Sequence, residues 1–312
     1  MKAMRKEQAA VSEIDNTMMC CASCGTTAAG ADDDVKLKKC TACHLVKYCS
    51  VKCQKDHRPK HKKACKKRAA ELREELLFKQ PEGRNNGDCP ICCHPLPLDG
   101  NQFTFTACCC KLICLGCSYA HQQRELQQKL ELKCAFCRQA LPDTDEQLYE
   151  LLMKRIEVND PTAFWAMGNR REREGDYIGA FEYLSKAAKL GNMNAHYEIS
   201  LLYQKGQGVE VDLKKECYHL EEAAIGGHGD ARHNLGHREL QSLRFDRAMK
   251  HFIIAAKLGV DESLGMLKES SEVGLVRNED LAAAHRAHKA AVDATKTPQR
   301  EAVKNFLNER EE

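Results

Sequence analysis

The segment KCTACHLVKYCSVKCQKDHRPKHKKAC, residues 39–65, holds five cysteines, three histidines and eight lysines or arginines in 27 positions. Zinc prefers four thiolate or imidazole ligands in a tetrahedron, and a C-x2-C pair supplies two of them from one tight turn. Cys40 and Cys43 form such a pair, and further candidates follow at intervals of four: Cys49, Cys53, His57, His61 and Cys65. The segment therefore predicts a fold organised around metal rather than a set of reactive thiols.

A second C-x2-C pair, Cys21 and Cys24, precedes this segment and completes eight ligands, enough for two zincs. Residues four apart lie on one face of a helix, and we expect Pro59 to open a second short helix rather than to continue the first. His61 is preferred over His57 because it precedes Cys65 by one helical turn. The predicted ligands are Cys21, Cys24, Cys40, Cys43, Cys49, Cys53, His61 and Cys65.

The order C-x2-C, C-x2-C, YCS-x2-CQ, HK-x2-C, read from Cys21, Cys40, Tyr48 and His61, closely resembles the MYND zinc finger, here over residues 19–66. Arg58 stands where that family usually has a tryptophan. The resemblance implies interleaved sites: Cys21, Cys24, Cys49 and Cys53 on one zinc, and Cys40, Cys43, His61 and Cys65 on the other.

Positive charge is concentrated in the same region. Thirteen lysines and arginines and one acid, Asp56, lie between Lys36 and Arg68, a local charge of +12. Because the whole chain is +3, the remainder carries 3 − 12 = −9. The basic block has two interpretations. One is attraction to nucleic acid, an acidic protein tail or an import receptor. The other is a solvated surface whose charge offsets the negative zinc–thiolate groups.

A second cysteine series runs from Cys89 to Cys137, after a short helix and a Gly/Asn-rich linker predicted over residues 67–87. Its order, CPIC, then CCCKLICLGC, then CAFCR, again offers eight ligands for two zincs. It resembles the RING finger over residues 88–140. That resemblance implies one zinc on Cys89, Cys92, Cys114 and Cys117, and another on Cys134 and Cys137 with two of the triplet Cys108, Cys109 and Cys110. We take Cys108 and Cys109 as the pair.

RING fingers dock a ubiquitin-charged conjugating enzyme and hold its thioester in position, so the resemblance implies a possible ubiquitin transferase without a catalytic residue of its own. By position, Ile91 corresponds to the apolar contact between the first ligands. Arg138 corresponds to the cation after the last ligand. A cysteine–histidine hydrolase is not expected, because Cys217 lies inside a helical repeat and should pack there.

After Cys137 the composition changes to helical periods. A capping box at Thr144 and Gln147 predicts a connecting helix within residues 143–158. From residue 160 to 312 an internal repeat follows, with spacings of 32, 36 and 32 residues. Each unit shows an Ala pair before a glycine, a small residue four positions after the glycine and an apolar residue four later, as at Gly191, Ala195, Ile199, Gly227, Ala231, Leu235, Gly259, Ser263 and Leu267.

This period predicts a helix-turn-helix solenoid of about four repeats. The segment with Tyr203, Gly206, Gly208, Val209 and Asp212 matches Y-x2-G-x-G-V-x2-D and resembles Sel-like, tetratricopeptide-type repeats. We therefore expect two small zinc-stabilised fingers and an all-α helical-repeat solenoid, preceded by a disordered tail over residues 1–18.

The expected cofactor is Zn²⁺, about four per chain. No apolar run is long enough to cross a bilayer and no export signal is present, so reduced thiols and a cytoplasmic or nuclear location are expected. The predicted function is an intracellular scaffold that binds a protein partner through its repeats, and the RING resemblance adds the recruitment of ubiquitin transfer to that partner. The alternative is a non-enzymatic adaptor or nuclear regulator that uses the basic finger.

Overall fold

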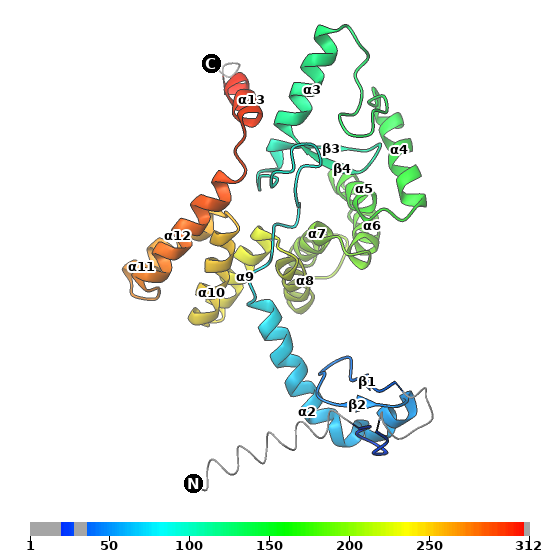
Figure 1. Ribbon diagram of the computed structural model, residues 1–312, viewed down its shortest axis with the longest axis vertical. Coiled ribbons are helices and arrows are strands. Elements are labelled where there is room, and N and C mark those ends of the chain that lie inside the picture. The colour runs from blue at the N-terminus through cyan, green and yellow to red at the C-terminus, as the bar shows by residue number, and fades with distance from the viewer. Residues whose placement is uncertain (1–19, 28–35, 309–312) are drawn as a thin grey trace. The chain divides into compact units, whose positions relative to one another are not determined.

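The computed structural model describes residues 20–27 and 36–308, so the tail predicted over residues 1–18 lies outside the described residues (Figure 1). The chain forms two compact units, Met1–Leu77 and Phe78–Glu312. The first unit contains the opening cysteine cluster, and the second contains the remaining cysteine cluster together with all of the repeats.

The first unit is built from a short hairpin and one long helix. Strands β1 (Lys38–Lys39) and β2 (Lys47–Tyr48) pair antiparallel, and helix α2 runs from Val51 to Leu77. The expected break at Pro59 does not occur, because α2 continues through it. Pro59 removes one backbone donor from the helix, but Cys53 on one side and His61 on the other are each gathered into a ligand group.

The second cysteine cluster surrounds a hairpin and a helix. After a 3-10 turn, Gly100–Gln102, strands β3 (Phe103–Thr106) and β4 (Lys111–Cys114) pair antiparallel, and the Cys108–Cys110 triplet forms their connecting turn. Helix α3 (Leu115–Gln127) starts directly after Cys114, whose sulfur accepts a hydrogen bond from the Cys117 backbone N–H at 3.4 Å.

Helix α4 (Asp145–Glu157) connects this finger to the repeats. The predicted cap is confirmed: the Gln147 N–H donates to Thr144 Oγ1 at 3.2 Å, and Gln147 Oε1 accepts from the Asp143 N–H at 2.8 Å. The apolar face of α4, including Leu148, Leu151 and Leu152, packs in one core with side chains of the hairpin and the first repeat helix.

The predicted helical solenoid is confirmed. Helices of the repeats pack in consecutive pairs, and the anchor residues Ala195, Ala231 and Ser263 are fully buried where neighbouring helices approach. A last helix follows the four pairs and packs on α3. The bounds are α5 (Pro161–Arg173), α6 (Tyr177–Lys189), α7 (Met193–Lys205), α8 (Leu213–Ile225), α9 (Gly229–Gln241), α10 (Phe245–Lys257), α11 (Asp261–Glu272), α12 (Asn278–Asp293) and α13 (Pro298–Asn308).

The Gly/Asn-rich linker lies near the start of the second unit and packs along the turns of the repeats. Arg84 donates to the carbonyls of Leu96 (3.0 Å), Leu258 (2.8 Å) and Ala291 (2.9 Å). Gly227 has a φ of +89°, and a methyl group added there would lie 2.3 Å from the Gly83 oxygen. Gly227 therefore permits the left-handed backbone of its own turn and also leaves room for the linker backbone.

Among the described residues, no helix has the length and apolar character that a membrane crossing requires.

Candidate metal centres and interaction surfaces

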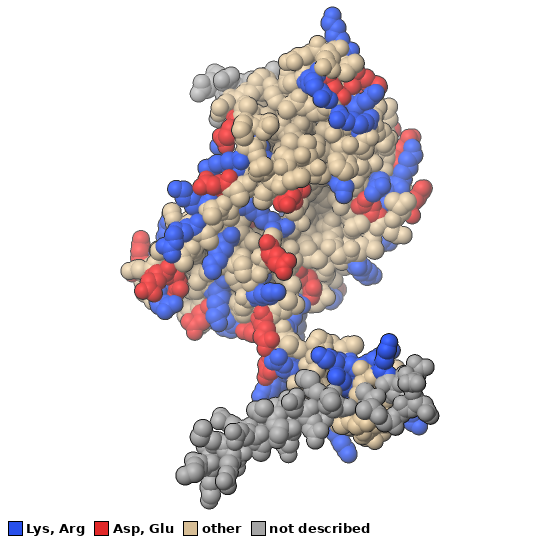
Figure 2. All heavy atoms as spheres, viewed as in Figure 1, with Lys and Arg blue, Asp and Glu red and all other residues tan. Residues whose placement is uncertain are grey.

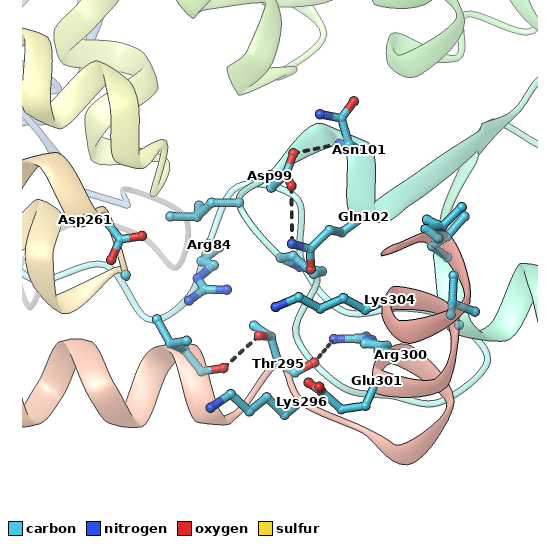
Figure 3. Close-up of a pocket in the computed structure, with 18 residues that line it drawn as sticks. Arg84, Asp99, Asn101, Gln102, Asp261, Thr295, Lys296, Arg300, Glu301 and Lys304 are labelled. Atoms are coloured by element: carbon cyan, nitrogen blue, oxygen red, sulfur yellow. Dashed lines mark hydrogen bonds between the residues drawn. The ribbon is translucent and has the colours of Figure 1, made fainter. Parts of the chain in front are cut away.

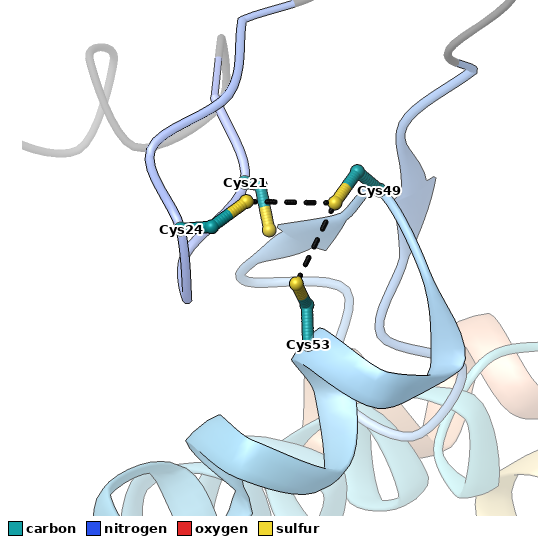
Figure 4. A group of neighbouring side chains, drawn as sticks. All are labelled: Cys21, Cys24, Cys49 and Cys53. Atoms are coloured by element: carbon teal, nitrogen blue, oxygen red, sulfur yellow. Dashed lines mark hydrogen bonds between the residues drawn. The ribbon is translucent and has the colours of Figure 1, made fainter.

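The first ligand group joins the start of the chain's described part to the beginning of α2. Cys21 and Cys24 come from one tight turn, Cys49 follows β2, and Cys53 lies in the first turn of α2 (Figure 4). Cys49 Sγ lies 3.5 Å from Cys24 Sγ and 3.6 Å from Cys53 Sγ. These are the four residues predicted for one zinc.

The second group joins the turn after β1 to the next turns of α2. Cys43 Sγ lies 3.1 Å from His61 Nε2, and Cys40 Sγ lies 3.8 Å from Cys65 Sγ. His57 does not enter the group: its Nδ1 lies 3.1 Å from Tyr48 Oη, and its ring stacks on His61 at 5.6 Å. The choice of His61 over His57 matches the geometry.

Two further groups lie in the second finger. Cys89, Cys92, Cys114 and Cys117 come together, as do Cys108, Cys109, Cys134 and Cys137. Cys92 Sγ lies 3.8 Å from Cys114 Sγ, Cys109 Sγ lies 3.9 Å from Cys134 Sγ, and Cys137 Sγ lies 3.3 Å from Cys108 Sγ. The sixteen predicted ligands thus gather in the predicted fours.

The spacing of the sulfurs fits zinc. Four ligands at about 2.3 Å in a tetrahedron place neighbouring sulfurs about 3.8 Å apart, close to the separations above. The ligand atoms of each group all lie within 4.8 Å of one another. The protein therefore has four Cys/His groups suited to zinc, and each supplies a full set of four ligands.

Backbone donors prepare one cysteine in each of three groups to bind as thiolate. Burial alone would raise the pKa of the Cys21 thiol, but hydrogen bonds from the backbone of Cys24, Cys49 and Ser23 outweigh it and lower the pKa to about 6. Cys89 and Cys134 follow the same pattern, and the backbone of the residues after each brings its pKa to about 7. A thiolate is the form that binds metal.

Cys110 is the member of the triplet left outside the groups. It is 6% exposed and packs with Ala107, Leu152 and Met167 in the core shared with α4 and α5. Burial raises the pKa of the Cys110 thiol to about 12, so it stays protonated at neutral pH. Its role is packing, which leaves Cys108 and Cys109 as the candidate ligands.

Helix α3 braces the last ligand pair of the second finger. Glu125 is buried, and its carboxylate accepts the Lys133 N–H at 2.9 Å and contacts His121 Nε2 at 3.1 Å. His121 in turn lies 3.2 Å from Arg138 Nη1. These contacts fix the chain on both sides of the Cys134–Cys137 turn against one helix.

The two residues predicted to dock a conjugating enzyme lie at the surface of this finger. Ile91 is 41% exposed between the first two ligands, and Arg138 is exposed after the last one. Sequence reasoning missed Phe136, which is 44% exposed between Cys134 and Cys137. Its place between two ligands, as for Ile91, was the signal that could have found it.

Helix α13 holds the opposite end of this finger. Arg300 donates to the carbonyls of Pro95 (2.7 Å), Thr295 (2.6 Å) and His94 (3.3 Å) and lies 3.5 Å from Cys92 Sγ. Figure 3 shows Arg84 and Arg300 on the walls of a cavity of about 420 Å³. Both guanidinium groups are directed to backbone carbonyls, so they serve structure there.

The basic block of the first unit is solvent-facing. The lysines of α2 between Lys60 and Lys67 are exposed (Figure 2). Near the end of the block, Arg68 pairs with Glu71 at 3.2 Å and with Glu75 at 2.9 Å. Acids of α2 thus offset part of the charge, and the remaining lysines face water.

Comparison with known families identifies the first finger. A family model of the MYND finger matches residues 21–65, which confirms the predicted MYND-type finger.

Curated relatives match part of the chain. DAP3-binding cell death enhancer 1 of Rattus norvegicus is 31% identical over 70 residues, 22% of this chain and 14% of that protein. The Mus musculus protein of the same name is 24% identical over 203 residues, 52% of this chain and 40% of that protein. The chain spans less than half the length of either relative.

Two solved structures align with about half of the chain. A Sel1 repeat protein from Oxalobacter formigenes aligns with a TM-score of 0.42 and 17% identity, covering 48% of this chain and 67% of the other. The antigen c5321 of uropathogenic Escherichia coli, which has an SLR fold, aligns with a TM-score of 0.39 and 21% identity, covering 54% and 37%.

Proposed function

We propose that this protein is a zinc-dependent interaction scaffold whose second finger docks a ubiquitin-conjugating enzyme while its repeats hold the protein to be modified. The scaffold role is supported by the MYND-type finger and by the helical-repeat solenoid. Zinc with four protein ligands leaves no position for a reacting water, so the sites act by shaping a surface.

One observation carries the ligase role. Ile91 and Phe136 expose apolar side chains on the turns of two different ligand groups, and Arg138 stands beside the second turn, held by His121. Two exposed apolar residues at fixed distance on rigid turns, with one cation, suit a small protein interface. A ligase of this kind works by positioning the thioester, which requires no nucleophile from this chain.

Ubiquitin chain formation with purified full-length, zinc-loaded protein and a panel of conjugating enzymes tests the ligase role. Ile91→Ala and Arg138→Ala should each abolish or strongly reduce chain formation. Leu130→Ala and Lys129→Ala are matched controls, because both residues are exposed in the same finger but lie outside the ligand turns. If no panel member supports activity in the wild-type protein, the ligase role fails and the non-enzymatic adaptor is favoured.

The scaffold role has a separate test. The two rodent relatives are named for binding DAP3, so DAP3 is the first partner to try. Full-length protein should retain DAP3 or another defined partner on an affinity resin. Retention unaffected by substitutions on the repeat surface would contradict the assignment of that surface as the partner site.

A further inference from the structure

A second cavity, of about 210 Å³, lies where the second finger meets the repeats. The linker and β3 supply one wall, through Asn85, Asn86 and Phe103, and helices α5, α7 and α9 supply the other. Asn194 Nδ2 donates to Asn86 Oδ1 at 3.1 Å, and the Asn85 N–H donates to the Gly227 carbonyl at 3.3 Å. The walls are therefore joined by hydrogen bonds, and the cavity is a built feature of the second unit.

The walls combine carboxylates with aromatic rings. Glu198 and Asp230 line the cavity together with Trp165, Tyr197 and Phe103. Trp165 is braced from the finger by Phe105, whose ring meets it edge-on at 6.4 Å. Tyr197 stacks on His228 at 4.3 Å. Aromatic faces next to carboxylates attract cations through both the ring quadrupole and the negative charge.

No lysine or arginine is among the described residues that line this cavity. No ion pair joins Glu198 or Asp230 to a lysine or arginine among the described residues. Burial, with the negative charges of Glu172 and Asp230 nearby, raises the pKa of Glu198 to about 7, although Lys205 acts in the opposite direction. A cation in the cavity would relieve this repulsion.

Two N–H groups in the cavity wall also require a ligand that brings hydrogen-bond acceptors. His228 is 8% exposed, and its Nδ1 accepts the Ala231 N–H at 3.3 Å, so the proton of the neutral ring lies on Nε2. Trp165 Nε1 is buried and has no hydrogen-bond partner among the described residues. Both side chains line the cavity. An alkylammonium ion would leave them unsatisfied, whereas a peptide brings carbonyl oxygens alongside its cationic side chain.

We propose that this cavity binds a lysine or arginine side chain carried on a partner peptide. The inference rests on the proposed scaffold function, because it names the chemistry of the partner segment. The finger contributes part of the site through Phe103 and the linker, so the finger and the repeats recognise the partner together.

Fluorescence anisotropy with full-length, zinc-loaded protein tests the proposal. The probes are labelled octapeptides of alternating Lys and Ser, or of Gln and Ser, and n-butylammonium serves as a competitor. The lysine peptide should bind, the glutamine peptide should not, and n-butylammonium should compete only weakly. Glu198→Gln and Trp165→Leu should each weaken lysine-peptide binding about tenfold.

Glu182→Gln is the control, because it removes the same charge from an exposed site on α6 outside the cavity. Equal loss with Glu182→Gln, or none with Glu198→Gln, would reduce the binding to general charge attraction and overturn the proposal. If a defined partner is retained equally by wild type and Glu198→Gln, the scaffold function stands and only the cation pocket fails. If peptides bind as expected but no partner is retained, the scaffold function is the part that fails.

Discussion

At the scale of single residues, adjacent cysteines have opposite roles. Cys109 reaches toward Cys134 at 3.9 Å, whereas Cys110 turns into the core beside Leu152. A positive φ of +53° at Cys110 accompanies this change of direction in the turn. One residue along the chain thus separates a candidate metal ligand from a packing residue.

Cys109→Ala should therefore lose one zinc, because removing one of the four thiolates weakens zinc binding at that site. Cys110→Ala should retain all zincs and lose about 1 kcal/mol or more of stability, because it leaves a small cavity in the core. Zinc per chain, measured by elemental analysis after gel filtration, separates the two. Loss of zinc from Cys110→Ala with retention in Cys109→Ala would reverse the assignment.

Substitutions at two repeat glycines distinguish the cost of backbone strain from the cost of a clash with the linker. Gly191 and Gly227 have φ values of +90° and +89°, so alanine at either position costs about 1 kcal/mol in backbone strain. Nothing lies within 4 Å of a methyl group at Gly191, whereas Gly83 blocks the one at Gly227. Gly227→Ala should lose about 1–3 kcal/mol more than Gly191→Ala in urea unfolding. Equal losses of stability in the two variants would mean that the linker does not pack against Gly227.

At the scale of elements, Arg300 joins helix α13 to the second finger. Its contacts to the carbonyls of Pro95 and His94 cross 205 and 206 positions of sequence. The N-terminal part of α13 approaches α3 so closely that a methyl group at Gly116 would lie 2.7 Å from the Arg300 nitrogen. The helix and the finger therefore depend on each other for their position.

Arg300→Gln should release α13, because glutamine cannot reach several carbonyls as the guanidinium does. Hydrogen exchange over residues 298–308 should speed up at least about tenfold, with the repeat helices unchanged. Lys304→Gln is the matched control, since Lys304 is exposed on the same helix and the same cavity. Unchanged exchange in Arg300→Gln would show that α13 is held by its apolar contacts alone.

Local patterns in the sequence predicted the elements whose causes are local. Cysteine spacing indicated the ligand turns, and the Ala–Gly register anticipated the repeats, because both reflect turn chemistry within a few residues. The interleaved grouping of those turns into fours came from the resemblance to the MYND and RING fingers, not from spacing. The continuity of α2 through Pro59 and the packing of Arg84 depend on contacts with distant residues, which no local pattern records. The cation cavity was missed for the same reason. An available signal was the polar or acidic residue three positions after each repeat glycine, Asn194, Asp230 and Glu262.

At the scale of the whole molecule, the repeats bury histidines that stay neutral. Burial lowers the pKa of His219 and His228 to about 4, and burial with nearby arginines lowers that of His251 to about 3. His251 is fully buried, and neither ring nitrogen has a hydrogen-bond partner among the described residues. In each case the unfolded chain takes up a proton at higher pH than the folded one.

The free energy of unfolding of the second unit should therefore be greatest above about pH 6.5 and fall as the pH drops toward 4. Glu198 acts in the opposite direction, since its raised pKa favours the folded form as the pH falls from about 7. Urea unfolding between pH 7.5 and 5.5, with zinc release followed by a chromogenic chelator, checks the slope. His251→Leu should flatten it, while His285→Leu, at an exposed position, should not.

The hydrogen bonds of Arg84 to Ala291 and of Arg300 to Pro95 have a consequence for the protein's synthesis. The ribosome makes Arg84 and Pro95 more than 200 residues before the residues that they bond to. At 5–20 residues per second this interval is about 10–40 s. During that time the finger lacks these two contacts, so a chain that stalls within the last repeat would hold its finger only through α4, α5 and the earlier repeats.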